Sequence, residues 1–75
     1  MNNDLRIKDL YLASYLLAKG YNLKTVVRSS GICWFVFEKV DEQIINKFWS
    51  GKAMCGAKAY SDAIRTLKDR IFSEK

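Results

Sequence analysis

The chain has no histidine and no proline among its 75 residues, and it has only two cysteines. Without histidine it lacks the commonest general base and a frequent metal ligand. Without proline its turns depend on glycine and small polar residues. Cys33 and Cys55 follow neither a C-x-x-C pattern nor a metal-ligand spacing, so we interpret both as reduced thiols that fill the core. We expect no metal site and no cofactor.

Recognisable catalytic motifs are missing as well. The sequence contains no glycine-rich phosphate loop, no H-E-x-x-H pair and no nucleophile elbow. Glu38, Asp41 and Glu42 are clustered, but capping of a helix explains two of these carboxylates. Cys33 lies among apolar residues in the middle of a predicted strand, which is a poor setting for a reactive thiolate. We therefore predict a protein that is not an enzyme and has no catalytic residues.

Long apolar runs are absent too. The N-terminal residues, MNNDLRIKDL, lack the apolar core of a signal peptide. The most apolar stretch, Leu10 to Ala18, is far too short to cross a bilayer. We expect a cytoplasmic protein of a microbe or its virus, with no membrane association.

The amount of apolar material predicts one small domain over residues 1–75, with residues 1–6 as a frayed arm. Hydrophobic residues make up 49% of the chain, although a chain of this length buries only about 60% of its unfolded surface. We expect a second copy to complete the core, giving a homodimer. The net charge of +5 permits an anionic partner, but the cations are spread evenly along the chain.

A core helix is predicted from about Lys8, closed by Gly20. Leu10 and Leu17 fall on one side of this helix, whereas Leu12 and Leu16 fall on another. A surface helix has a single apolar stripe. This helix must therefore be covered on more than one side, by the rest of the chain or by a second copy.

The remaining pattern predicts an α+β fold in the order α-β-β-α-α, with one antiparallel β-hairpin packed with three helices. Alternation over residues 23–28 and the β-branched and aromatic run 32–37 indicate two strands. Helices follow from Asp41 to Gly51 and over residues 57–72. In this interpretation Trp49 belongs to the core, and so do Ala53, Met54 and Cys55 of the linker before the last helix.

The hairpin carries the hypothesis of nucleic-acid binding. Its loop consists either of Ser29 to Gly31 or of Ser30-Gly31, and a slip of one residue exchanges the two faces of a strand. In both registers one face holds two cations beside aromatic rings, an arrangement that can stack bases and pair phosphates. The candidate DNA- or RNA-binding residues on this hairpin and on the last helix are Lys24, Arg28, Trp34, Lys68 and Arg70.

A second interpretation of the same face is open at this stage. A helix or a second subunit could cover it, with Lys24 and Arg28 extending to the rim. The chain would then be a protein–protein adaptor or a self-assembling regulator that uses the hairpin and the first helix as its interface.

Four segments together resemble a family of short bacterial and phage proteins whose domain has no known function. These segments are DLYLASYLLAKGY, WFVFE, IINKFWSGK and AIRTLKDRIF, and they span about residues 7–72. The resemblance implies a small α/β domain, frequently encoded by phages or mobile elements. It implies no activity and transfers no functional residue.

Overall fold

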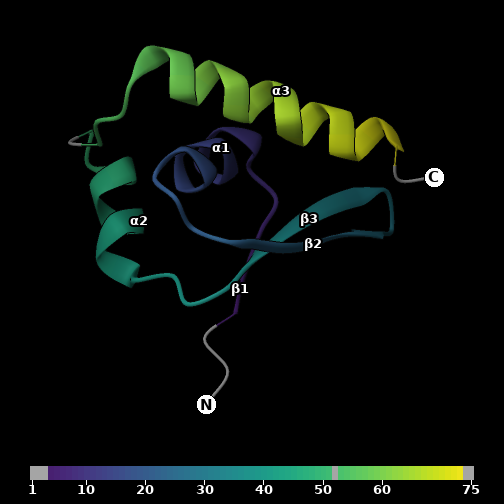
Figure 1. Cartoon of the computed structure of the whole chain (residues 1–75). Coiled ribbons are helices and arrows are strands. Elements are labelled where there is room, and N and C mark those ends of the chain that lie inside the picture. Colours follow the sequence, from purple (N-terminus) through teal and green to yellow (C-terminus); the bar gives the residue numbers. More distant parts are fainter. Residues whose placement is uncertain (1–3, 52, 74–75) are drawn as a thin grey trace.

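The computed structural model describes residues 4–51 and 53–73. Within these ranges three helices pack with a three-stranded antiparallel sheet of order β1-β3-β2 (Figure 1). The elements are β1 (Leu5–Ile7), α1 (Leu10–Ala18), β2 (Leu23–Ser29), β3 (Ile32–Phe37), α2 (Glu42–Trp49) and α3 (Ala57–Ser73). The predicted α+β class, the hairpin and the three helices are confirmed, and the sheet has one strand more than predicted.

The additional strand is β1, which lies partly in the segment predicted to be a frayed arm. Leu5 pairs with Phe37, and Ile7 pairs with Phe35. That part of the prediction is wrong for Leu5 and Arg6, while residues 1–3 lie outside the described residues. Three residues are too few for alternation to reveal a strand, and β1 forms because β3 offers it an open edge.

The hairpin turn is the two-residue Ser30-Gly31 loop. Both residues have positive φ, 52° and 80°, as the type I′ turns of short hairpins require. Ser29 consequently pairs with Ile32, and Val26 pairs with Phe35. Of the two registers considered from the sequence, the one with the shorter loop is therefore present. It directs the Phe35 side chain toward the helices and the Trp34 side chain to the opposite face.

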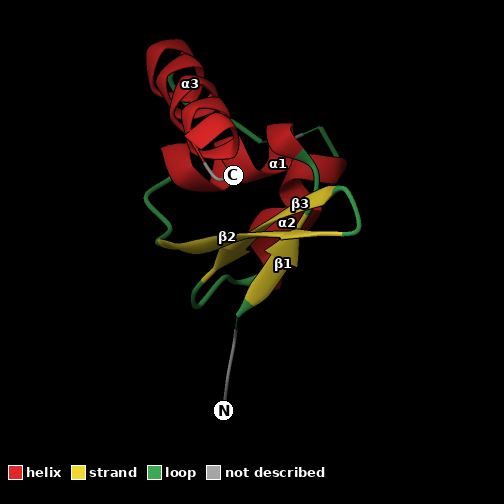
Figure 2. Ribbon diagram, turned by 90° about the vertical axis from the view of Figure 1, so that its right-hand side faces the viewer, coloured by secondary structure: helices red, strands yellow, loops and turns green. Residues whose placement is uncertain are grey.

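Helix α1 is the centre of the fold. Asp9 caps its first turn, because its Oδ1 accepts hydrogen bonds from the backbone N–H groups of Tyr11 at 2.8 Å and Leu12 at 3.3 Å. Gly20, at a φ of +98°, adopts the left-handed conformation that follows the helix. All five residues from Leu12 to Leu16 are buried. The predicted cover on more than one side is confirmed, and a single chain provides it: α3 crosses α1 on one side and the sheet lies on the other (Figure 2).

Helix α2 packs with one narrow face only. Asp41 caps it as predicted, accepting from the N–H of Gln43 at 3.0 Å. Ile44 and Phe48 are partly buried against the core, but Trp49, at the border of this face, is 63% exposed. The prediction that Trp49 is a core residue is therefore wrong.

The linker after α2 also departs from the prediction. Ala53 packs against the core, whereas Met54 is 80% exposed. Cys55 is exposed too, while Cys33 is partly buried. Only one of the two cysteines therefore contributes to the core, because the linker passes over the outside of the molecule on its way to α3.

Helix α3 covers α1 with a stripe of small and aliphatic residues. Ala63 and Leu67 are buried, and Tyr60 and Ile71 are partly buried beside them. Helices α1 and α3 both lie on the same side of the sheet, and no described helix lies across its other side (Figures 1 and 2). This leaves an outer face of the sheet without a helical cover.

Candidate functional site

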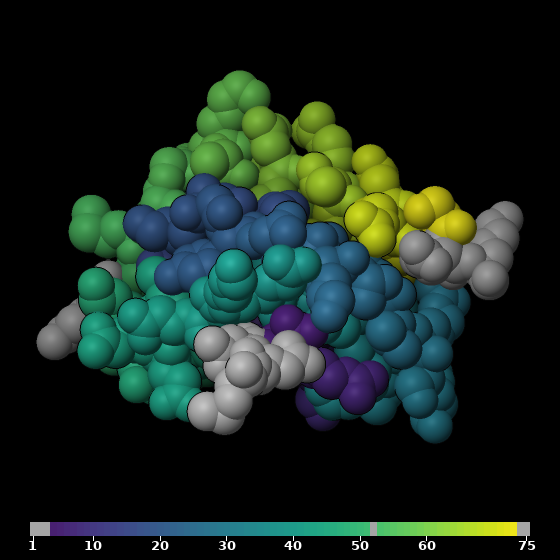
Figure 3. Space-filling model, turned by 60° about the horizontal axis from the view of Figure 1, so that its bottom comes forward, coloured from purple at the N-terminus to yellow at the C-terminus, as the bar shows by residue number. Residues whose placement is uncertain are grey.

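The outer face of the sheet brings together a cation and a ring from two neighbouring strands. Trp34 of β3 is half-buried there, and the exposed Arg6 of β1 places its guanidinium carbon 5.7 Å from the centre of the Trp34 ring. A guanidinium at this distance is attracted by the electron-rich face of the indole. In Figure 3, β1 (purple) lies at the surface between the segment leading into α2 and the hairpin. The Arg6–Trp34 pair thus marks an accessible site.

An apolar groove continues from this pair along β1 to α2. Its volume is about 380 Å³, and both tryptophans of the chain contribute to its lining. We call it the tryptophan groove; its lining residues are Leu5, Arg6, Ile7, Lys8, Asp9, Leu12, Trp34, Ile45 and Trp49. Asp9 is the one carboxylate among them, and it is already engaged in capping α1. With Arg6 and Lys8 against Asp9, the lining carries a formal net charge of +1.

The hairpin cations predicted to flank Trp34 lie elsewhere. Lys24 forms a 2.7 Å salt bridge with Asp4 at the end of the sheet where β1 begins. The hydrogen bond and the negative charge of Asp4 raise the pKa of Lys24 above its usual value. Arg28 pairs with Cys33 in the register, and its Nη2 donates to the backbone carbonyl of Ile71 in α3 at 2.8 Å. Arg28 therefore holds α3 against the hairpin on the helical side of the sheet.

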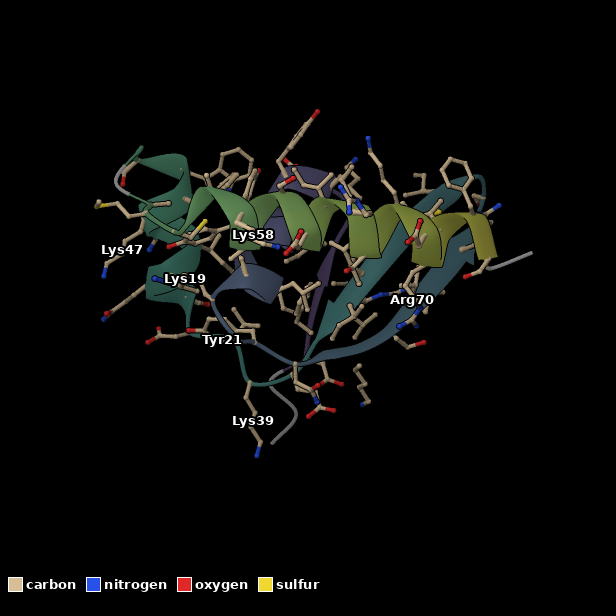
Figure 4. The ribbon with its side chains drawn as sticks, turned by 45° about the horizontal axis from the view of Figure 1, so that its top comes forward. Lys19, Tyr21, Lys39, Lys47, Lys58 and Arg70 are labelled. Carbon is tan, nitrogen blue, oxygen red and sulfur yellow. The ribbon has the colours of Figure 1, made fainter. Side chains whose placement is uncertain are left out.

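The two predicted residues of α3 are also separated from Trp34. Lys68 is exposed and lines a hollow along α3 together with Ile64 and Phe72. Arg70 is partly buried near the end of α3 (Figure 4). Because α3 lies on the opposite side of the sheet from Trp34, the five predicted residues do not form one site.

Three residues of the site were missed by the sequence interpretation: Arg6, Lys8 and Trp49. Alternation over three residues, Leu5 to Ile7, is too short to identify Arg6 as a residue of an outer sheet face. The local sequence held no signal for Trp49 either, because its partners in the groove come from β1, a distant part of the chain.

An acidic hollow borders the tryptophan groove. Asp4, Asp41 and Glu42 line it, and it shares Leu5 and Ile45 with the groove. No group of three His, Cys, Asp or Glu side chains in the described part of the chain is arranged to hold a metal ion. Of its three carboxylates, Asp4 is paired with Lys24 by a salt bridge.

A third hollow lies between α1, the end of α2, the linker and the start of α3, and polar groups near it make local contacts. The Lys19 Nζ donates to the Met54 carbonyl at 3.2 Å and lies 6.0 Å from the centre of the Tyr15 ring. The Tyr60 hydroxyl donates to the Tyr11 carbonyl at 3.3 Å, and burial raises the pKa of Tyr60. These polar groups already have partners within the chain.

The cations labelled in Figure 4 are dispersed over the molecule. Lys19, Lys47 and Lys58 lie toward one end, and Arg70 lies toward the other. Lys58 is paired with Asp62 at 2.8 Å along α3. The labelled cations therefore do not gather into one patch.

Comparison with known proteins identifies a family. Among residues 4–51 and 53–73, none belongs to a helix of the length and apolarity needed to traverse a membrane. Neither the curated proteins nor the solved structures contain a match to the chain. The family model of a domain of unknown function, DUF5659, matches residues 2–73, nearly the whole chain. The chain therefore belongs to this family of unknown function, as its resemblance indicated.

Proposed function

We propose that this chain is a small non-catalytic protein that binds single-stranded nucleic acid on the outer face of its sheet. The observation that carries the proposal is the Arg6–Trp34 pair on a face without a helical cover. Sheets that bind single strands stack bases on aromatic rings and pair phosphates with neighbouring cations. One stacked base contributes about 1–3 kcal/mol in such proteins.

The cations of this face are available to phosphates. Arg6 and Lys8 are exposed, and neither forms a salt bridge with any residue that the structure describes. Lys24 and Lys58, in contrast, are neutralised by Asp4 and Asp62. The net charge of +5 adds a weaker, non-directional attraction for a polyanion. We propose that this protein is microbial or viral and acts in the cytoplasm, where DNA or RNA is the abundant anionic polymer.

A protein–protein adaptor or self-assembling regulator is the second candidate. Trp49, Met54 and Phe72 are 63%, 80% and 75% exposed, which favours contact with an apolar partner. Tyr11 of the first helix is 59% exposed as well, although Leu12–Leu16 of that helix are buried within one chain. A homodimer remains part of this second candidate.

Titration with oligonucleotides tests the proposal. Because both tryptophans line the same groove, stacking of a base should quench the intrinsic fluorescence of the protein. Single-stranded DNA and RNA and a DNA duplex, each of about 12 nucleotides, match the site sizes of comparable small binding domains. We expect single strands to bind more tightly than the duplex, with an affinity that falls steeply as salt increases.

A double charge reversal locates the site. Arg6→Glu combined with Lys8→Glu should weaken binding at least tenfold and lower the salt slope by about 1.4, the value for two phosphate contacts on a single strand. Arg65→Glu combined with Lys68→Glu makes the same change in net charge on α3. This second double variant should weaken binding less than the first. Equal losses in the two variants would contradict a site on the outer face.

Solution mass distinguishes the second candidate. Light scattering on the same samples measures whether the chain is a monomer or a dimer. A stable dimer, together with no fluorescence change at about 100 μM protein, the weak end of the usual range of non-specific dissociation constants, would replace the proposal by self-assembly.

A further inference from the structure

We infer that the tryptophan groove holds one unstacked base of the bound strand, so that binding depends on a base as well as on phosphates. The inference rests on the proposed function and specifies its ligand. The groove lies directly beside the Arg6–Trp34 pair, because Arg6 and Trp34 are themselves part of its lining. A base next to the one stacked on Trp34 can therefore enter the groove.

The walls of the groove suit a flat apolar ring. Leu5, Leu12 and Ile45 contribute aliphatic surface, and Trp49, at the end of α2, adds a second indole. Its volume of about 380 Å³ falls within the range of small-molecule sites, roughly 300–1,000 Å³. Trp49 is 63% exposed, although it is one of the largest apolar side chains in the chain. An inserted base would remove much of this indole from water.

Charge sets the direction in which the rest of the strand runs. Arg6 and Lys8 line the first side, that of the groove itself, and the acidic hollow adjoins the groove at Leu5 and Ile45 as the second. Asp4 of this hollow is paired with Lys24, so its negative charge comes mainly from Asp41 and Glu42. Phosphates are attracted to the first side and repelled from the second. The base therefore occupies the groove while the sugar–phosphate backbone follows the side of β1 that carries Arg6 and Lys8.

An acidic, apolar peptide is the competing occupant, and the sheet edge disfavours it. A peptide seated along β1 would satisfy its backbone by adding a strand to the sheet. Strand β1 has only three residues, Leu5–Ile7, and offers a very short ladder for such pairing. A nucleobase needs no ladder, because stacking and apolar burial hold it and its phosphates provide the charge.

Oligonucleotides without bases test the inference directly. A labelled strand of about 12 nucleotides is compared by fluorescence anisotropy with a strand of equal length made only of deoxyribose and phosphate. We expect the base-free strand to bind at least tenfold more weakly. Trp49→Ala should remove most of this difference, whereas Trp49→Phe, which retains a ring, should preserve it.

Phe72→Ala is the matched control for losing an exposed aromatic side chain. Phe72 is 75% exposed on α3, and its loss should leave both affinities unchanged. Thermal unfolding of each variant, followed by circular dichroism, verifies that the fold is intact. Should Trp49→Ala prove unfolded, Ile45→Val and Trp49→Phe, combined with competition by free nucleoside monophosphates, test the same groove.

The outcomes separate the two levels of the proposal. If the base-free strand binds at least tenfold more weakly but Trp49→Ala leaves this difference unchanged, the inserted base is overturned and the proposed function stands. Equal binding of the strands with and without bases overturns both, because stacking on Trp34 also needs a base. Absence of binding to either strand overturns both. Binding of a Leu- and Glu-rich peptide that depends on Trp49, without oligonucleotide binding, assigns the groove to a protein partner and likewise overturns both.

Discussion

The two faces of the sheet differ in what covers them, although β3 contributes alternate residues to each. On the inner face Val26, Phe35 and Phe37 are at most 7% exposed beneath the helices. On the outer face Val36 is also buried, at 8% exposure, whereas Trp34 is half-buried beside the Arg6 side chain. An unbroken apolar run such as ICWFVF therefore does not require a helix on both faces. The inner face forms the core of the fold, and the proposed binding site lies on the outer face.

Phe37→Ala should produce the largest effect, on the inner face. Phe37 is completely buried, and removal of a buried phenylalanine ring costs about 3–5 kcal/mol. In a chain of this size that loss approaches the whole free energy of unfolding. Urea denaturation followed by circular dichroism measures the change. Trp34→Ala, on the outer face, should lower the free energy of unfolding by less than half as much. Equal losses would show that the two faces contribute equally to stability.

Ser14→Ala should act in the opposite direction and stabilise the interior. The Ser14 hydroxyl is fully buried, and its oxygen has no hydrogen-bond partner among the described residues. Removing a buried polar group without a partner relieves its desolvation cost, and alanine also favours the helix, so we expect a gain of about 1 kcal/mol. The matched control is Ala13→Ser, which adds a hydroxyl at a neighbouring buried position and should destabilise. If Ser14→Ala is destabilising, the hydroxyl has a partner after all.

Much of the inner half of the molecule could be predicted from local sequence. Helix α1 is apolar on two sides, and its Asp9 and Gly20 mark its ends. The hairpin turn was limited to two registers by Ser30-Gly31. These features depend on residues close together in the chain, so that local physical rules were sufficient to identify them.

The candidate site could not be predicted in the same way, because its parts meet only through tertiary pairing. Arg6 reaches Trp34 since β1 adds to β3, a pairing between residues far apart in the chain. The choice between two loop lengths then decided that Trp34, and not Arg28, faces outward. Of the residues predicted from the hairpin, Trp34 alone remains part of the proposed site.

Arg28→Ala should have a smaller effect, and on stability alone. Arg28 donates to the carbonyl of Ile71 in the last turn of α3, where a cation also interacts favourably with the helix dipole. We expect a loss of about 0.5–1 kcal/mol in the free energy of unfolding. Oligonucleotide affinity should stay within about twofold, because Arg28 lies on the helical side of the sheet. A tenfold loss of affinity in a folded Arg28→Ala variant would show instead that the binding site includes Arg28, on the helical side of the sheet.

Glu42→Gln should give the smallest effect, an increase of about twofold in oligonucleotide affinity. Its carboxylate lines the acidic hollow beside the tryptophan groove, and surface charges at such separations are strongly screened. Asp69→Asn on α3 makes the same change in net charge on the other side of the sheet, and we expect no change from it. The difference between the two variants should disappear at high salt, since it arises from repulsion at one place on the surface. If both substitutions raise the affinity equally, the strand responds to the net charge of the whole protein, and the path proposed for its phosphates beside Arg6 and Lys8 is wrong.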